Sequence, residues 1–357
     1  MKRMIPILLL AMMLPACTPI DLSISKDGKI LIPREGGFYS FDPATSTAVQ
    51  LAPAKKATFG LYNPAGQGAL LYDDGTFYAK VLSKPAMKLK SVSNLTYAAY
   101  LAGGKSLVYT NVSGQSDPEL KESFAEVHLI AGGKDTLLLK RSAKIVRPLA
   151  DGTILAIQIA KVNKDEKNHK SFTGKLVKIT TAAKVTPICD VTGESAMFLS
   201  ARHDGAKALL ICYAAGTYKP VSPNKKGKPV AQCYEIDLAT GKATLIGSTQ
   251  KINYAIYSPD GKNVLLQTAD SLVVANAAFT DRTPLADDGA ATIGGFGPST
   301  DSYPGWYNAT TIYYLRKVSV YGSSCTNMHL TLVDIKTTVK RDLQPAIDQA
   351  IINLAKK

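Results

Sequence analysis

Few residues of this 357-residue chain have the types and spacing that catalysis or metal binding would need. It has four histidines, and none forms HExxH or another close metal-ligand spacing. No GxSxG nucleophile elbow is present. The glycine-rich stretch 294–297 lacks the Lys-Ser/Thr pair of a phosphate-binding loop. The sequence therefore predicts no catalytic residue, no metal and no cofactor.

Two short segments are the best candidates for ligand binding. Arg202 and His203 directly precede an Asp-Gly turn, and the segment Tyr303-Pro-Gly-Trp-Tyr holds the only tryptophan. Aromatic side chains on a Gly/Pro-rich loop suit recognition of sugars or peptides. An equally good interpretation is that they form a structural plug. The predicted ligand-binding residues are Tyr303, Trp306, Tyr307, Arg316, Lys317, Arg202 and His203.

The cysteines allow one disulfide. Cys212 and Cys233 fall in apolar segments that should be neighbouring strands, so a bridge between them would close the Lys-rich loop at 213–229. Such a bond would stabilise the fold by about 3 kcal/mol, and the alternative is two small buried thiols. Cys189 and Cys325 are expected to lie in distant repeats and are left unpaired.

The first residues form a targeting segment. Lys2 and Arg3 precede an apolar run of 11 residues, Met4 to Leu14, which is too short to span a bilayer because a spanning helix takes about 20. The end of the run, Leu-Pro-Ala-Cys17, resembles a bacterial lipobox. The resemblance implies a signal peptide over 1–16, lipid on Cys17, and a short tether over 17–20. A secretory signal cut elsewhere is the other reading.

The localisation and partners follow from export and charge. Thr18 after the lipidated cysteine, by resemblance to Gram-negative sorting, implies the outer membrane. The net charge is +14, of which two positive charges leave with the signal. A basic exported protein favours an envelope protein or anionic envelope polymer as partner, and no nucleic acid. A merely solvated lysine-rich surface is the alternative, and we expect a monomer.

Two turn motifs recur along the chain in the same order. The first is Asp-Gly or a Gly-rich equivalent between two apolar segments, as in Tyr257-Ser-Pro-Asp-Gly-Lys. The second is an Asp turn, as in Asp42-Pro-Ala-Thr and Asp237-Leu-Ala-Thr, where the Asp side chain can bind the backbone two residues on. The first motif falls at 27–28, 65–66, 103–104, 151–152, 204–205 and 260–261, with a less regular copy at 307–308.

Joining the motifs gives seven units of about four antiparallel strands each. The segment after each first turn is strongly apolar, as expected for a strand buried on both faces. This pattern predicts an all-β chain with a β-propeller of four-stranded blades over 21–343. Seven blades fit best, with six or eight as alternatives. A β-sandwich does not predict the same two turns recurring in the same order.

The turn at Tyr257–Lys262 also carries a family resemblance. Its SPDGK letters are similar to the signature of WD-repeat-like bacterial propellers, such as the Tol-system propeller and the propeller halves of prolyl-oligopeptidase-type enzymes. Weaker copies stand at Ser25–Lys29 and His203–Gly205. The resemblance implies the fold, but not the function, because function lies in the loops.

In the last stretch, the spacing of the apolar residues changes from that of strands to that of a helix. In 344–357, together with Leu343, the apolar residues Ile347, Ala350, Ile351 and Leu354 recur at helical spacing. Asp342 is a suitable N-cap. We expect a short amphipathic helix that packs on the propeller, with docking to a partner or membrane as the alternative.

Together these features favour a lipid-anchored, extracytoplasmic β-propeller that acts as a non-catalytic binding scaffold. The alternative is an enzyme, a lyase or hydrolase, that acts on an envelope or imported glycan or peptide. Its site would lie at the propeller mouth, where residues from several blades could meet without forming a sequence motif.

Overall fold

The computed structural model describes residues 23–355, apart from short gaps. The gaps are 35, 67, 82–83, 113, 115, 121, 165–169, 194–195, 214–230, 247–251, 269–270, 286–303 and 320–325. Cys17 and the predicted signal peptide therefore lie outside the described residues, as does Tyr303. No helix in the described part of the chain is long and apolar enough to cross a membrane.

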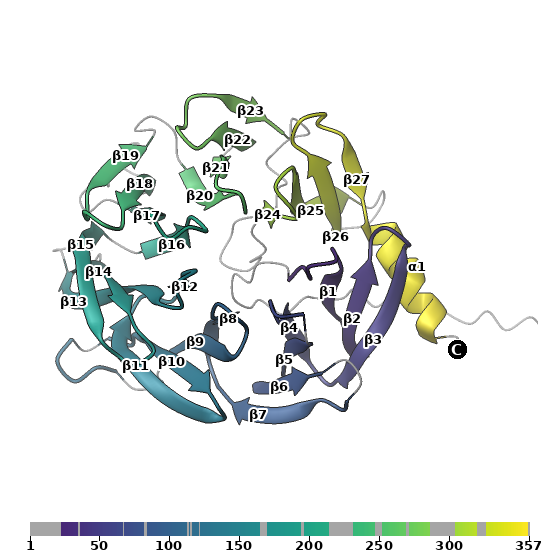
Figure 1. Ribbon diagram of the computed structural model, residues 1–357, viewed down its shortest axis with the longest axis horizontal. Coiled ribbons are helices and arrows are strands. Elements are labelled where there is room, and N and C mark those ends of the chain that lie inside the picture. The colour runs from purple at the N-terminus through teal and green to yellow at the C-terminus, as the bar shows by residue number, and fades with distance from the viewer. Residues whose placement is uncertain are drawn as a thin grey trace, which may run out of the picture.

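The chain is all-β, with one short helix near its C-terminus. Its antiparallel sheets follow one another around a ring in chain order (Figure 1). The first sheet has the order β1-β2-β3, and an isolated bridge between Ile24 and Ile30 precedes it. The second has the order β4-β5-β6-β7. Their bounds are β1 (Ile30–Arg34), β2 (Gly36–Asp42), β3 (Thr47–Ala54), β4 (Ala57–Tyr62), β5 (Ala69–Asp73), β6 (Thr76–Lys80) and β7 (Met87–Ser91).

The next sheet is the largest, with eight strands in the order β15-β14-β13-β11-β10-β9-β8, and β12 pairs with β13 beside this path. Its two halves join through one pair in the register of β11 and β13, Ser142 opposite Gln158. The strands are β8 (Leu95–Tyr100), β9 (Ser106–Val112), β10 (Ala125–Ala131), β11 (Lys134–Ser142), β12 (Arg147–Pro148), β13 (Ile154–Lys164), β14 (Lys170–Ile179) and β15 (Val185–Gly193).

Three four-stranded sheets complete the ring, and each runs in simple chain order. The innermost strands of these sheets are β16, β20 and β24 (Figure 1). The strands are β16 (Ala196–Ala201), β17 (Lys207–Tyr213), β18 (Ala231–Asp237), β19 (Ala243–Ile246), β20 (Ile252–Tyr257), β21 (Asn263–Thr268), β22 (Leu272–Asn276), β23 (Arg282–Pro284), β24 (Gly305–Trp306), β25 (Thr311–Ser319), β26 (Thr326–Asp334) and β27 (Lys340–Asp342).

Both predicted turn motifs are present where the sequence placed them. In all six regular copies of the first motif, the glycine has a positive φ and its N–H donates to the carbonyl three residues earlier, as from Gly261 to Ser258. Glycine suits these positions because a Cβ is strained there. In the second motif, Asp42 Oδ1 accepts the N–H of Ala44, and Asp237 and Asp334 bind their own turns in the same way.

Neighbouring sheets pack face to face, and the last sheet packs against the first. Leu31 and Phe38 from the first sheet meet Leu71 from the second. At the other end of the chain, Ile30 and Phe41 share a buried cluster with residues of the last sheet and helix. The ring is thus closed by side-chain packing between the first and last sheets. The last sheet and the C-terminal segment 343–350 contribute Tyr313, Leu330, Leu332, Leu343, Ile347 and Ala350 to this cluster.

The helix α1 (Gln344–Ala355) lies against the outer strand of the first sheet, β3 (Figure 1). Leu343, Ile347 and Ala350 are buried, and Ile351 and Leu354 pack at the edge of the same cluster. This is the apolar face that the sequence predicted. Asp342 Oδ1 accepts the N–H of Gln344, as expected of a capping residue.

Candidate binding pocket

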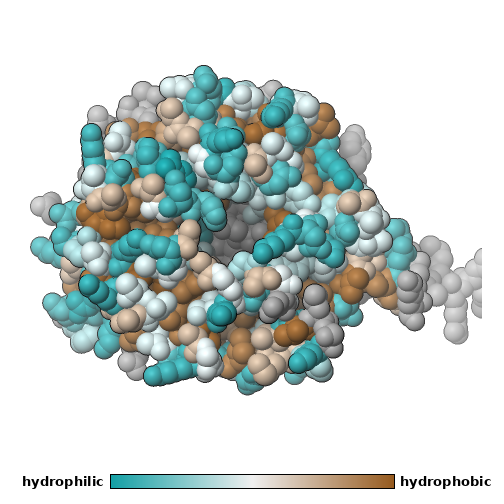
Figure 2. Space-filling view, viewed as in Figure 1, coloured by the Kyte–Doolittle hydropathy of each residue, from teal (hydrophilic) through white to brown (hydrophobic). Residues whose placement is uncertain are grey.

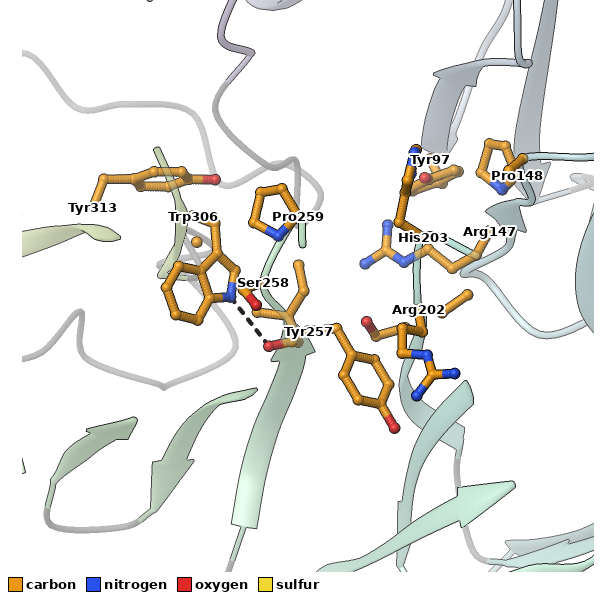
Figure 3. Close-up of a pocket in the computed structure, with 15 residues that line it drawn as sticks. Tyr97, Arg147, Pro148, Arg202, His203, Tyr257, Ser258, Pro259, Trp306 and Tyr313 are labelled. Carbon is orange, nitrogen blue, oxygen red and sulfur yellow. Dashed lines mark hydrogen bonds between the residues drawn. The ribbon is translucent and has the colours of Figure 1, made fainter. Parts of the chain in front are cut away.

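A cavity of about 350 Å³ opens at the centre of the ring. It lies between the inner ends of β8, β12, β16, β20 and β24, which face one another across the centre (Figure 1). Figure 2 shows the face hollowed at this point, with hydrophilic side chains projecting toward the hollow. The innermost strands of several sheets therefore supply one site, which Figure 3 shows in close-up.

Arg147 is a buried charged group of the pocket. Its side chain is buried in β12, and its Nε donates to the carbonyl oxygen of Leu199 at 2.6 Å. Its guanidinium lies 5.0 Å from the ring centre of Tyr97 and 4.9 Å from that of Phe198. Attraction between the cation and the aromatic faces fixes this plane. In Figure 3 the guanidinium points toward the opposite wall, where Ser258 and Pro259 lie.

A second arginine, Arg202, lines the pocket from the turn that follows β16. Both Asp204 carboxylate oxygens accept from its Nε, at 2.9 and 3.0 Å, and Asp204 Oδ2 lies 2.7 Å from Nη2. This pairing raises the pKa of Arg202 and lowers that of Asp204. The pair ties the side chain to its own turn, so Arg202 contributes a positive charge that Asp204 partly neutralises.

The opposite wall is built from the end of β20 and from β24. Trp306 is buried, and its indole N–H donates to the carbonyl oxygen of Ile256 at 3.2 Å (Figure 3). Tyr257 donates its hydroxyl to Glu235 at 2.7 Å, and Lys207 pairs with the same carboxylate. Burial and then Glu235 raise the pKa of Tyr257 well above its ordinary value. These residues form a rigid wall whose tyrosine stays neutral.

The pocket is equipped for holding an anionic or aromatic-stacking ligand. The Ser258 hydroxyl donates to Asp260 and accepts the N–H of Asn263. Both of these hydrogen bonds are within its own turn. His203 is exposed at the rim. In the described part of the chain, no group of three or more His, Cys, Asp or Glu side chains could hold a metal ion. The chemistry offered is positive charge, hydrogen-bond donors and aromatic surface.

The predicted binding residues divide into three groups. Arg202, His203 and Trp306 all line the central pocket. Tyr307 is not among the residues that line the pocket, and its hydroxyl donates to the backbone carbonyl oxygen of Gly28 in the turn before β1. Arg316 and Lys317 belong to β25, opposite His329 and Met328, but their side chains lie outside the description, as does Tyr303. Trp306 is buried in the pocket wall, and its contact with a ligand stays a prediction.

The strand register argues against the predicted disulfide. In β17 and β18, Cys233 lies opposite Ile211, and Cys212 lies opposite Gln232. A cross-strand disulfide needs two cysteines with closely approaching Cβ atoms, whereas these two are offset by one residue. Because successive residues of a strand alternate between faces, the offset assigns the two positions to opposite faces of the sheet. Cys233 is buried in the core.

Arg147 and Tyr97 were missed by the sequence reasoning. Neither belongs to a repeated turn motif, and the pocket forms only when strands from different sheets meet. One signal did exist, because Arg147 stands between Val146 and Pro148 in a segment otherwise suited to burial. An arginine in such a place is seldom fully buried unless it is paired or stacked.

No protein-family model matches the chain, and no curated protein sequence does either. Solved structures with β-propeller-like folds do resemble it. An oligogalacturonate lyase in complex with manganese is 16% identical, with a TM-score of 0.63 over 91% of each chain. A hydrazine synthase from Kuenenia stuttgartiensis is 11% identical, with a TM-score of 0.60 over 97% of this chain and 100% of the other.

A puromycin-hydrolysing peptidase from Mycobacterium tuberculosis is 12% identical, with a TM-score of 0.59. That match covers 93% of this chain and 54% of the peptidase. At such low identities these likenesses show the fold alone, and the neighbours themselves include proteins with unrelated activities.

Proposed function

We propose that this protein is a lipid-anchored, extracytoplasmic β-propeller of seven blades that acts as a non-catalytic binding scaffold. Its ligand is an acidic group of an envelope protein or an anionic envelope polymer, held at the central pocket. The observation that carries the proposal is the position of Arg147, whose guanidinium is stacked on aromatic rings and aimed across the pocket (Figure 3).

Seven blades are supported by the way the largest sheet divides. Its two halves, β8–β11 and β12–β15, each have four strands and join through one residue pair. The bridge at Ile24 supplies a short innermost strand to the first sheet. Counting the halves separately gives seven units in chain order, which is the number that the sequence motifs predict.

An anionic ligand is supported by the charges of the pocket and of the chain. A guanidinium presents a planar fork of donors that matches a carboxylate or phosphate. The net charge of +14 would also attract an anionic surface from a distance. The location rests on the resemblance of the Leu-Pro-Ala-Cys17 segment to a lipobox.

The test is affinity capture of the tagged full-length protein from cross-linked envelopes, compared among three variants. Cys17→Ser removes the predicted anchor, and His203→Glu places a negative charge at the pocket rim. Lys184→Glu changes an exposed residue in the outer turn between β14 and β15 and serves as the control. We expect one stoichiometric partner or polymer with the wild type and Lys184→Glu, and its loss with the other two. Equal capture by His203→Glu would exclude the pocket as the contact site.

A lyase is the second candidate, because the pocket brings Arg147, His203 and Tyr257 together. The likeness to an oligogalacturonate lyase suggests an acidic oligosaccharide as the substrate to try. Incubation with such oligosaccharides, with and without added manganese, should yield unsaturated products if this candidate is right. Binding without product formation supports the scaffold.

A further inference from the structure

A second and larger cavity lies away from the central pocket, between the first two sheets. It has a volume of about 590 Å³, within the range typical of small-molecule sites. Phe38 and Leu71 lie in its floor and are each only 1% exposed, and Ala52 beside them is also buried. The floor is therefore a preformed apolar surface.

We propose that this groove binds a single-chain amphiphile with an anionic head, of the long-chain carboxylate class. The lining is mainly apolar, with Leu51, Pro53 and Ala54 from β3 and with Pro85 and Ala86 just before β7. An alkyl chain in contact with these walls would lose water from apolar surface on both sides, which is the main source of affinity for such a ligand.

The head group is inferred from the charged residues of the lining. Lys55 is exposed, and Lys80 is half-buried with its Nζ donating to the carbonyl oxygen of Lys84. An ammonium has three N–H groups, so Lys80 keeps two for a ligand while its position is fixed. The single carboxylate of the lining, Asp73, accepts the backbone N–H groups of Lys55 and Lys56. The lining thus has two cations against one anion.

Two exposed apolar side chains are next in the chain to residues of the lining. Val81 follows Lys80 and is 47% exposed, and Met87 follows Ala86 and is 63% exposed. Contiguous exposed apolar surface is typical of an interaction site, and these two side chains add apolar surface near the two ends of the segment between β6 and β7. The polar and charged groups of the lining are few, so they suit one head group better than the many backbone groups of a peptide.

This inference does not depend on the proposed scaffold function, because the two cavities share no lining residue. The experiment is a titration of the purified full-length protein with a fluorescent long-chain carboxylate. A calorimetric titration with the unlabelled carboxylate and with an alcohol of equal length follows. Three variants are compared with the wild type: the double variant Lys55→Glu/Lys80→Glu, Ala86→Trp, and Lys242→Glu. The last changes an exposed lysine beside the turn between β18 and β19 and is the charge control.

We expect the wild type and Lys242→Glu to bind the carboxylate at least tenfold more tightly than the alcohol. The double lysine variant should lose at least tenfold for the carboxylate and little for the alcohol. Ala86→Trp should weaken both, because the indole would fill the groove. Thermal unfolding of each variant shows whether it is folded. Because Lys55 is exposed, we expect the double lysine variant to disturb folding less than Ala86→Trp. No binding by the wild type, or equal losses in Lys242→Glu, would overturn the proposal.

Discussion

Tyr307 donates its hydroxyl to the backbone carbonyl oxygen of Gly28 at 2.7 Å, although 279 residues separate them in the chain. The contact joins the strand end after β24 to the turn before β1. A second bond of this kind runs from Arg341 Nη2 to the carbonyl oxygen of Pro43, and Arg34 pairs with Asp348 of α1. The first sheet and its preceding turn are therefore held to the last sheet and α1 by these side-chain bonds, in addition to the packing of the last sheet on the first.

Replacing Tyr307 with Phe removes this closing hydrogen bond and leaves the ring in place. We expect a loss of about 0.5–1.5 kcal/mol in the free energy of unfolding, measured by urea denaturation, since that is the usual net contribution of such a bond. Tyr100→Phe is the control, because its hydroxyl has no protein partner among the described residues. Equal losses in the two variants would show that closure does not depend on the Tyr307 bond.

The docked helix α1 should stabilise the packing between the first and last sheets. Leu343 and Ile347 are at most 1% exposed and belong to the cluster shared by the first and last sheets. We expect Ile347→Ala to lower the free energy of unfolding by about 2–4 kcal/mol, because it leaves a cavity in the core. Ile352 on the same helix is 48% exposed, so Ile352→Ala should change stability by less than about 0.5 kcal/mol. Similar effects from both would mean that the helix does not dock.

The all-β fold with its short C-terminal helix could be predicted because its signals are local. Each first-motif turn needs a positive φ at its glycine. Most of the strands that follow these turns are buried on both faces, which selects apolar runs such as Leu209 to Ile211. The helix could be predicted equally well, from the spacing of its apolar residues. Repetition of local rules is enough to indicate a ring of sheets without any long-range information.

The site could be predicted only in part, for a physical reason. Arg202 and His203 were found because they adjoin a repeated turn, whereas Arg147 is defined by its contacts with Tyr97 and Phe198 on other strands. The disulfide prediction assumed that Cys212 and Cys233 are directly opposite, and a register offset of one residue is invisible in the sequence. Contacts between elements, unlike turns, leave little local trace.

Two turn glycines with the same conformation provide a matched test of how the pocket is supported. Gly205 and Gly261 both have φ of +70°, and a Cβ on Gly205 would meet nothing within 4 Å. A Cβ on Gly261 would lie 3.2 Å from the side chain of Arg202. We expect Gly205→Ala to cost about 1–2 kcal/mol from the left-handed backbone alone.

Gly261→Ala should cost at least as much as Gly205→Ala and should also displace Arg202 in the pocket. Urea denaturation measures the stability of both variants. A crystal structure or NMR spectrum of each then reports whether the Arg202–Asp204 pair is intact. A displaced pair in Gly205→Ala but not in Gly261→Ala would contradict this account of the turn.

Acid stability should depend on Asp151, which lies in the turn between β12 and β13. Partial burial pushes its pKa upward, but the Lys178 ammonium and the Thr153 donors outweigh that effect and lower the pKa from 3.8 to about 2. A carboxyl whose folded pKa is lowered stabilises the protein above its unfolded pKa. That contribution is lost as the pH falls from about 4 to about 2. The carboxyl is half exposed, so the effect is modest.

We therefore expect Asp151→Asn to be less stable than the wild type at pH 7, with the difference shrinking toward pH 2. Lys178→Met removes the partner that lowers the pKa of Asp151, so it should also be less stable than the wild type at pH 7 and should lose less stability between pH 4 and pH 2. Lys184→Met, an exposed lysine on the neighbouring strand connection, should leave the acid profile unchanged. Urea midpoints of the four proteins between pH 7 and pH 2 give the measurement. A constant difference between the wild type and Asp151→Asn over this range would show that the Lys178–Asp151 pair does not contribute to acid stability.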